Sequence, residues 1–167
     1  MSQSDRNTAA TTTERTSDVE LVVTRIVKGP PRLVYQAWAD PALFPQWWAP
    51  KSFCMTILSY EADVRTGGTY RLVMSHATSD QPVAFFGKYL EVVPGARIVW
   101  TNDEGDDEGS VTTVTFTENA GQTLVVVHER FPSKAALDEA IASGSSSGWG
   151  EQLAQLEEFV GETAGEA

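Results

Sequence analysis

Two histidines are the residues best suited to acid–base chemistry in this chain, and each falls in a strand-like alternation of side chains. His76 shares its phase with Met74, and His128 shares its phase with Val126. A histidine on such a face can act as a general base or as a polar anchor for a ligand. More commonly it is a buried residue that hydrogen-bonds a neighbour. Neither histidine is tied to a serine, a cysteine or a carboxylate by a recognisable motif, so we predict no catalytic residue.

No metal site and no cofactor are expected. Two histidines supply too few ligands for zinc, with only Glu129 nearby in the sequence. Cys54 is the single cysteine, so an internal disulfide and a multi-cysteine zinc site are excluded. The acidic run "DEGDDEG" (103–109) lacks the spacing of EF-hand calcium ligands, and we interpret it as a solvated hairpin tip.

The segment "DPALFPQWWAP" (40–50) concentrates three aromatic residues and three prolines. The prolines rule out one continuous helix or a central strand there. The rings can plug one end of the fold, or they can line and gate the mouth of a pocket. These interpretations are compatible, because a pocket wall is also a core wall. A surface for a protein partner is the less favoured interpretation.

Length and charge narrow the class of protein. The 167 residues suit one domain with a core, and a net charge of -11 argues against nucleic acid and anionic membranes as partners. No apolar run is long enough for a signal peptide or a membrane span, so we expect a cytoplasmic protein. The expected organisation is a flexible tail over residues 1–18, a single domain over residues 19–162 and a C-terminal tail over residues 163–167.

The elements that must position these residues follow from periodicity. Residues 19–27 alternate as a strand, and Pro30 and Pro31 then suit the start of a helix that Asp40 ends. About six strands follow, and the chain closes on a helix. Its apolar stripe consists of Trp149, Leu153, Leu156 and Val160. This order favours an α+β fold in which the last helix crosses one face of an antiparallel sheet, and a sheet that curls around one helix leaves a pocket.

Five segments, in order, resemble the SRPBCC (START-like) superfamily, and specifically proteins similar to the C-terminal domain of the heat-shock protein 90 ATPase activator. They are "TRIVKGPPRLVYQAWADPALFPQWWAP", "EADVRTGGTYRLVM", "GKYLEVVPGARIVWT", "VTFTENAGQTLVVVHERF" and "SGWGEQLAQLEEFV". The resemblance covers about residues 19–160. It implies the helix-grip fold: a curved antiparallel sheet of about six to seven strands around a long C-terminal helix, with two short helices after the first strand.

The resemblance names no substrate. It implies a hydrophobic cavity, and we predict that the cavity binds a small hydrophobic or amphipathic molecule without catalysis. One alternative is a co-chaperone-like interaction module with a chaperone partner. A second is a cyclase- or hydrolase-like enzyme that uses a cavity histidine. By family analogy we also expect a homodimer. The ligand-binding residues that we predict are Trp38, Phe44, Trp47, Trp48, Tyr70, Met74, His76, Phe85, Trp100, Phe116, His128, Trp149 and Leu153.

Overall fold

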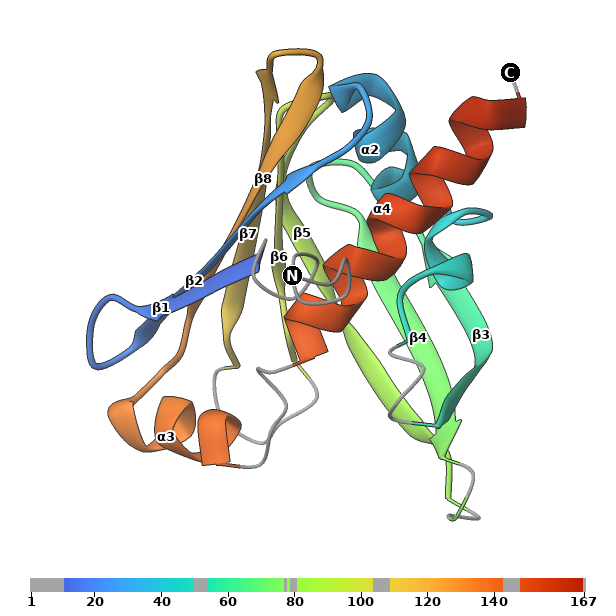
Figure 1. The fold of residues 1–167 in the computed structure, drawn as a ribbon. Coiled ribbons are helices and arrows are strands. Elements are labelled where there is room, and N and C mark those ends of the chain that lie inside the picture. Colours follow the sequence, from blue (N-terminus) through green and yellow to red (C-terminus); the bar gives the residue numbers. More distant parts are fainter. Residues whose placement is uncertain are drawn as a thin grey trace.

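One curved antiparallel sheet and a long C-terminal helix lying across it dominate the protein (Figure 1). The computed structural model describes residues 11–49, 54–76, 78, 81–103, 109–142 and 148–166. Residues 104–108 of the acidic run, Pro50 and the first ten residues of the expected tail lie outside this part.

The sheet has eight strands in the order β1-β2-β8-β7-β6-β5-β4-β3. Their bounds are β1 Thr11–Arg15, β2 Glu20–Val27, β3 Met55–Ala62, β4 Thr69–His76, β5 Val83–Val93, β6 Arg97–Thr101, β7 Val111–Asn119 and β8 Gln122–Arg130. Neighbouring strands pair antiparallel throughout. The predicted α+β helix-grip architecture is therefore confirmed, with one strand more than expected.

The additional strand is β1, which lies inside the expected flexible tail. Residues 11–15 pair with β2, and Thr13 is opposite Val23. Four of the five β1 side chains are exposed, so the strand carries no apolar alternation that sequence reasoning could detect. The expectation of a tail is thus wrong for this segment. The C-terminal helix also continues to Glu166, beyond the expected end of the domain at residue 162.

Three further helical segments lie in the part of the chain that the structure describes. The bounds of the helical segments are α2 Pro31–Ala39, η1 Phe44–Gln46, α3 Lys134–Ala142 and α4 Gly148–Glu166. As predicted, α2 begins at the proline pair and ends at Asp40, whose Oδ1 accepts a 2.8 Å hydrogen bond from the backbone N–H of Ala42. The second short helix is the 3₁₀ turn η1. No helix in the described ranges is both long and apolar enough to span a bilayer.

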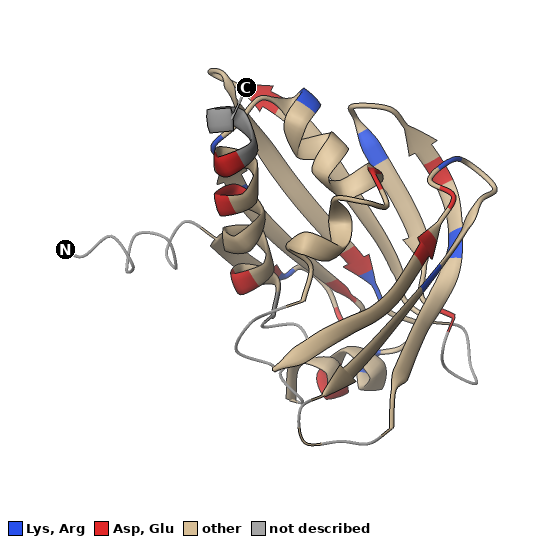
Figure 2. Cartoon of the chain, turned by 90° about the vertical axis from the view of Figure 1, so that its right-hand side faces the viewer, with Lys and Arg blue, Asp and Glu red and all other residues tan. Residues whose placement is uncertain are grey.

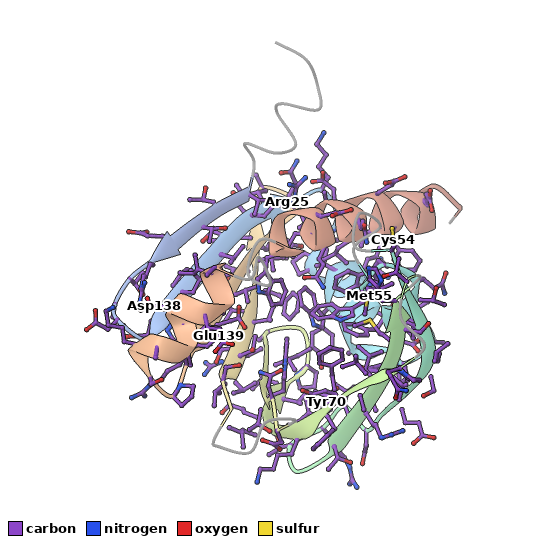
Figure 3. All side chains as sticks on the ribbon, turned by 90° about the horizontal axis from the view of Figure 1, so that it is seen from below. Arg25, Cys54, Met55, Tyr70, Asp138 and Glu139 are labelled. Carbon is purple, nitrogen blue, oxygen red and sulfur yellow. The ribbon has the colours of Figure 1, made fainter. Side chains whose placement is uncertain are left out.

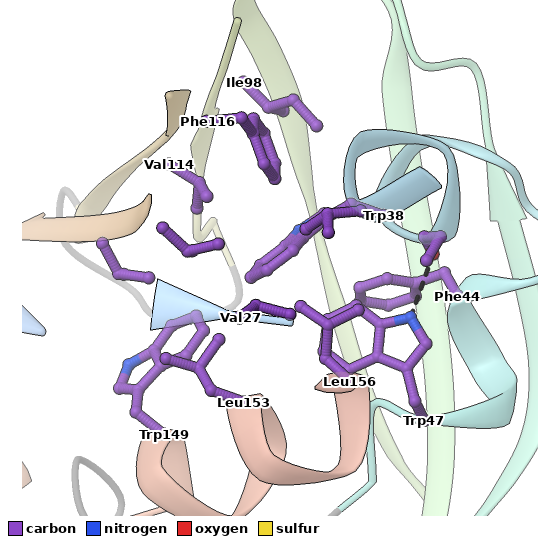
Figure 4. Close-up of a cluster of buried hydrophobic side chains, with 14 of the residues drawn as sticks. Val27, Trp38, Phe44, Trp47, Ile98, Val114, Phe116, Trp149, Leu153 and Leu156 are labelled. Carbon is purple, nitrogen blue, oxygen red and sulfur yellow. Dashed lines mark hydrogen bonds between the residues drawn. The ribbon is translucent and has the colours of Figure 1, made fainter. Parts of the chain in front are cut away.

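The helix α4 packs its predicted apolar stripe onto the sheet and α2 (Figure 4). All four stripe residues, from Trp149 to Val160, are buried, and burial of such side chains stabilises a fold by about 1.5–3 kcal/mol each. Acidic residues recur along the other side of α4 (Figure 2), where Glu158 and Glu162 are exposed.

Candidate functional site

A cavity of about 380 Å³ lies between α4 and the concave face of the sheet. Strands β3 to β8 contribute to its wall, together with α2, η1, α3 and α4. Met55 and Tyr70, labelled in Figure 3, are two of the lining residues on the sheet. The lining brings together residues that are more than a hundred positions apart in the sequence.

One wall of the cavity is a set of mutually packed aromatic rings. The rings of Trp38 and Trp149 stack with centroids 6.3 Å apart, and Trp48 meets Trp149 edge-on at 5.5 Å. Phe44 stacks on Trp48 with centroids 4.6 Å apart. Because the rings meet one another both stacked and edge-on, the wall can offer ring faces and ring edges to a ligand.

Glutamine side chains of α4 hold the segment that carries Trp47 and Trp48. Gln152 Nε2 donates to the carbonyl oxygen of Trp48 at 2.9 Å, and Gln155 Nε2 donates to the carbonyl oxygen of Trp47 at 2.7 Å. The indole Nε1 of Trp47 donates to the carbonyl oxygen of Ala37 at 2.9 Å. Trp47 is only 2% exposed and does not line the cavity, whereas Trp48 does. The two adjacent tryptophans therefore have different roles: Trp47 fills the core and Trp48 forms cavity wall.

The cavity has a polar end formed around Glu129 of β8. Glu129 Oε1 accepts a 2.7 Å hydrogen bond from Trp149 Nε1, and the carboxylate also accepts from the hydroxyl of Thr112. Asn102 Nδ2 donates to Thr112 Oγ1 at 3.3 Å. Burial raises the pKa of Glu129, and the hydrogen bonds from Trp149 and Thr112 oppose that rise. The result is one carboxyl group, held by neutral donors, in a largely aromatic cavity.

Three tyrosines form a second polar group on the side of β3, β4 and β5. Burial raises the pKa values of Tyr60 and Tyr89, whose hydroxyls hydrogen-bond each other. The hydroxyl of Tyr70 donates to the carbonyl oxygen of Thr101 at 2.7 Å. The raised pKa values keep the hydroxyls of Tyr60 and Tyr89 neutral at physiological pH, and all three tyrosine hydroxyls are already engaged in hydrogen bonds.

The structure brings many of the predicted ligand-binding residues to this cavity. Those that line it are Trp38, Phe44, Trp48, Tyr70, Met74, Phe85, Trp100 and Trp149. Trp47, Phe116 and Leu153 are buried in the adjoining core instead. The inward phase of Phe85 holds because the register shift of β5 lies between Tyr89 and Glu91, beyond Gly87.

The two predicted histidines do not reach the cavity, which corrects their expected placement. His128 lies on the opposite face of β8 from the buried Val125 and Val127. Its Nε2 is 2.7 Å from Glu20 Oε2, and its side chain is 36% exposed. The Nδ1 of His76 is 3.1 Å from the backbone nitrogen of Thr78, which donates to it. An enzyme built on a cavity histidine therefore has no histidine in position.

Sequence reasoning missed several polar lining residues, of which Glu129 and Gln152 are the most informative. Glu129 shares the phase of Val125 and Val127, so a carboxyl group in step with two buried valines was the available signal. Gln152 is one turn after Trp149 on the packed side of α4. Across the described ranges, no group of three or more His, Cys, Asp or Glu residues could hold a metal ion.

Comparisons with solved structures show the same fold. A crystal structure of a Nitrosomonas europaea protein matches with a TM-score of 0.81 and 22% identity over 90% of this chain and 99% of that chain. A Chromobacterium violaceum protein is 34% identical over 83% of this chain and 95% of that chain, with a TM-score of 0.68. A Rhizobium leguminosarum protein is 30% identical over 91% and 98% of the two chains, with a TM-score of 0.66.

The family comparison agrees with the fold. No curated protein sequence matches the chain. The sequence model described as "Activator of Hsp90 ATPase homolog 1-like protein" matches residues 28–161, which run from before α2 into α4 and include all of the described residues that line the cavity. The gripped helix, the sheet order and this match together place the chain in the Activator of Hsp90 ATPase homolog 1-like family.

Proposed function

We propose that the protein binds a small hydrophobic or amphipathic molecule in the cavity between α4 and the sheet, without catalysing a reaction. The observation that carries the proposal is the aromatic wall of Trp38, Trp48 and Trp149 beside one polar end at Glu129. Apolar walls supply affinity and a few polar groups supply orientation in most small-molecule sites. The volume of about 380 Å³ falls within the usual range for such sites, which is roughly 300–1,000 Å³.

The proposed role is binding because of where the ionisable groups lie. Glu129 is the sole carboxyl group among the described lining residues, and the two histidines lie outside the cavity. A hydrolytic or isomerising site generally pairs a base with a second polar group that acts on the same substrate atom. The acceptors and donors around Glu129 are engaged with one another instead, which suits recognition. A cytoplasmic location stays a prediction from the composition.

A saturable fluorescence titration tests the proposal, because four of the five tryptophans line the cavity. We expect 4-phenylbutanol, an uncharged amphipathic probe, to change the tryptophan emission saturably. Leu72→Trp should weaken the binding measured by calorimetry, because Leu72 is buried at the cavity wall and a larger ring fills the space. Leu58→Trp is the matched control, since Leu58 is 55% exposed and outside the wall.

Two results would overturn the proposal. One is the absence of a saturable response in folded protein. The other is equal binding by wild type and Leu72→Trp, with circular dichroism showing both folded. Native mass spectrometry of protein purified from its host would add the mass of a retained ligand and the subunit count, which also tests the expected homodimer.

A second candidate function is stimulation of a chaperone ATPase, favoured by the name of the matching family. Leu58 on β3 and Phe86 on β5 are large apolar side chains that remain 55% and 41% exposed, and such residues can contribute to a partner surface. The test is the steady-state ATPase rate of Hsp90 with saturating amounts of this protein. An unchanged rate would remove the candidate.

A further inference from the structure

The carboxyl group of Glu129 lies at the wall of an aromatic cavity, and no cationic side chain is among the described residues that line this cavity with it. Its hydrogen bonds come from Trp149 Nε1 and from the hydroxyl of Thr112, both of which are neutral. The described lining residues include no lysine, arginine or histidine. His128 is the next residue along β8, but it points to the other face of the sheet and contacts Glu20.

An ionised carboxylate in such a place is costly unless a positive charge compensates it. Removing a carboxylate from water is expensive, and buried charges in proteins are generally paired. Two neutral donors recover part of that cost. The remainder can be recovered by a positive group that enters the cavity with a ligand, so this end of the cavity is complementary to a cation.

The rings around Glu129 favour the same class of ligand. Trp149 donates its N–H to Glu129, and its ring packs against those of Trp38 and Trp48. The face of an indole ring carries partial negative charge and attracts ammonium groups. Gln152 also lines the cavity, and its amide nitrogen is already donating to the carbonyl oxygen of Trp48, so its amide oxygen is the atom that it can offer a donor.

We infer that the cavity selects a small organic cation, an amine or ammonium group on an apolar body, with the positive group against Glu129 and the rings of Trp149 and its neighbours. This inference rests on the proposed binding function and deepens it by naming the charge of the ligand. An anionic ligand is excluded by the same groups, because the carboxylate and the ring faces both repel it. The net charge of -11 also favours the approach of cations over anions.

Three probes with one skeleton separate charge from apolar contact: 4-phenylbutylamine, 4-phenylbutanol and 4-phenylbutyrate, titrated calorimetrically at pH 7.5. We expect the amine to bind at least about tenfold more tightly than the alcohol, as a charge-assisted hydrogen bond and a cation–π contact together imply. The negatively charged probe, 4-phenylbutyrate, should bind most weakly. The preference for the amine over the alcohol is the quantity that tests the inference.

The variants Glu129→Gln and Glu129→Asp test whether the preference for the amine depends on the negative charge of Glu129, because the first removes that charge and the second keeps it. With Glu129→Gln, the amine should bind within about threefold of the alcohol, because the variant lacks the negative charge and its neutral amide is a weaker acceptor for an ammonium group than a carboxylate is. The alcohol should still bind, and Glu129→Asp should keep the preference for the amine. Glu158→Gln makes the same charge change at an exposed position of α4 and should leave all three affinities unchanged.

The outcomes distinguish this inference from the proposed function. Binding of the alcohol or the butyrate as tightly as the amine overturns the inference and leaves the binding function standing. A preference for the amine that is undiminished in Glu129→Gln also overturns it. If none of the three probes binds the folded wild type, the binding function fails and the inference fails with it.

Discussion

The indole Nε1 of Trp149 donates a 2.7 Å hydrogen bond to Oε1 of Glu129, and this bond joins α4 to β8 at the cavity wall. It places the acidic group beside the aromatic wall. It also couples the packing of the gripped helix to the ionisation of one carboxyl group, because the same bond favours the charged form that burial disfavours.

The ionisation of Glu129 should make stability depend on pH. Burial raises the pKa of Glu129 in the folded protein, so its contribution to stability is fully present below its unfolded pKa of about 4.5. That contribution is lost as the pH rises through the higher folded value. Glu129→Gln removes the ionisation, so it should increase the free energy of unfolding at pH 7 relative to wild type. The gain should shrink as the pH falls toward 4.5.

Urea denaturation between pH 4 and pH 8 measures this difference. Glu158→Gln is the control, because it removes a carboxyl group that is exposed on α4. The effect of Glu158→Gln should be small and flat with pH. A Glu129→Gln variant that is less stable than wild type by the same margin at every pH would contradict the prediction.

The ion pair between Arg25 and Glu157 should be the costliest one in the described chain to break. Arg25 Nη2 lies 2.9 Å from Glu157 Oε2, and the two side chains are 1% and 16% exposed. Glu157→Gln removes the carboxylate that pairs with a buried arginine charge and should lower the free energy of unfolding by about 3–5 kcal/mol. The double variant Arg25→Met/Glu157→Leu should recover most of that loss, because an apolar pair of similar volume removes both desolvation costs.

Chemical denaturation of the single and double variants measures both effects. The comparison pair is Arg97 and Glu91, 3.1 Å apart and about half exposed. Breaking it with Glu91→Gln should cost less than about 1 kcal/mol. If Glu157→Gln and Glu91→Gln lower the free energy of unfolding equally, burial does not set the strength of the ion pair between Arg25 and Glu157.

The sequence was sufficient to predict the fold because the apolar periodicities are long and unambiguous. The i, i+4, i+7, i+11 stripe from Trp149 to Val160 is buried as predicted, since no other face of α4 can bury so much apolar area. The strand β1 escaped prediction for the opposite reason. Its residues, Thr11–Arg15, are polar and mostly exposed, so only the pairing of their backbone with β2 reveals the strand.

The candidate site was harder to predict because β8 is apolar in both phases. Leu124 and Val126 alternate with Val125 and Val127, so the pattern alone does not say which set faces α4. The phase that includes His128 was assigned to the cavity, but that residue lies outside, and Glu129 lies at the cavity wall instead. Because the strand phase differs by one residue from the predicted one, the cavity wall contains the carboxyl group of Glu129 instead of the imidazole of His128, which changes the chemistry expected of the site.

Gly87 should not tolerate a side chain, although it lies inside a strand. A Cβ atom there would be 2.0 Å from the carbonyl oxygen of Thr101, the same oxygen that accepts the hydrogen bond from Tyr70. Backbone atoms cannot move aside cheaply, so Gly87→Ala should cost about 3 kcal/mol or more and weaken the binding of cavity probes. Thermal denaturation and probe titration measure the two effects.

Gly161→Ala is the matched control, since nothing lies within 4 Å of the Cβ position at this helical glycine. Alanine is the better helix former, so this change should be neutral or stabilise the protein by up to about 1 kcal/mol. If the two glycine variants have the same stability, the close approach of Thr101 to β5 does not exist in solution.

Substitutions of the adjacent Trp47 and Trp48 should affect different properties: the first should lower folding stability and the second should weaken ligand binding. Trp47→Phe removes the indole that donates to the carbonyl of Ala37 and leaves a buried acceptor unpaired, so it should cost about 1–3 kcal/mol of stability. Its affinity for the probe should stay near that of wild type, because Trp47 does not line the cavity.

Trp48→Ala removes part of the cavity wall and should weaken the binding of 4-phenylbutanol several-fold through lost apolar contact. Denaturation and calorimetry on both variants give the two quantities, and a loss of affinity in Trp47→Phe that exceeds the loss in Trp48→Ala would show that Trp47 also controls the cavity.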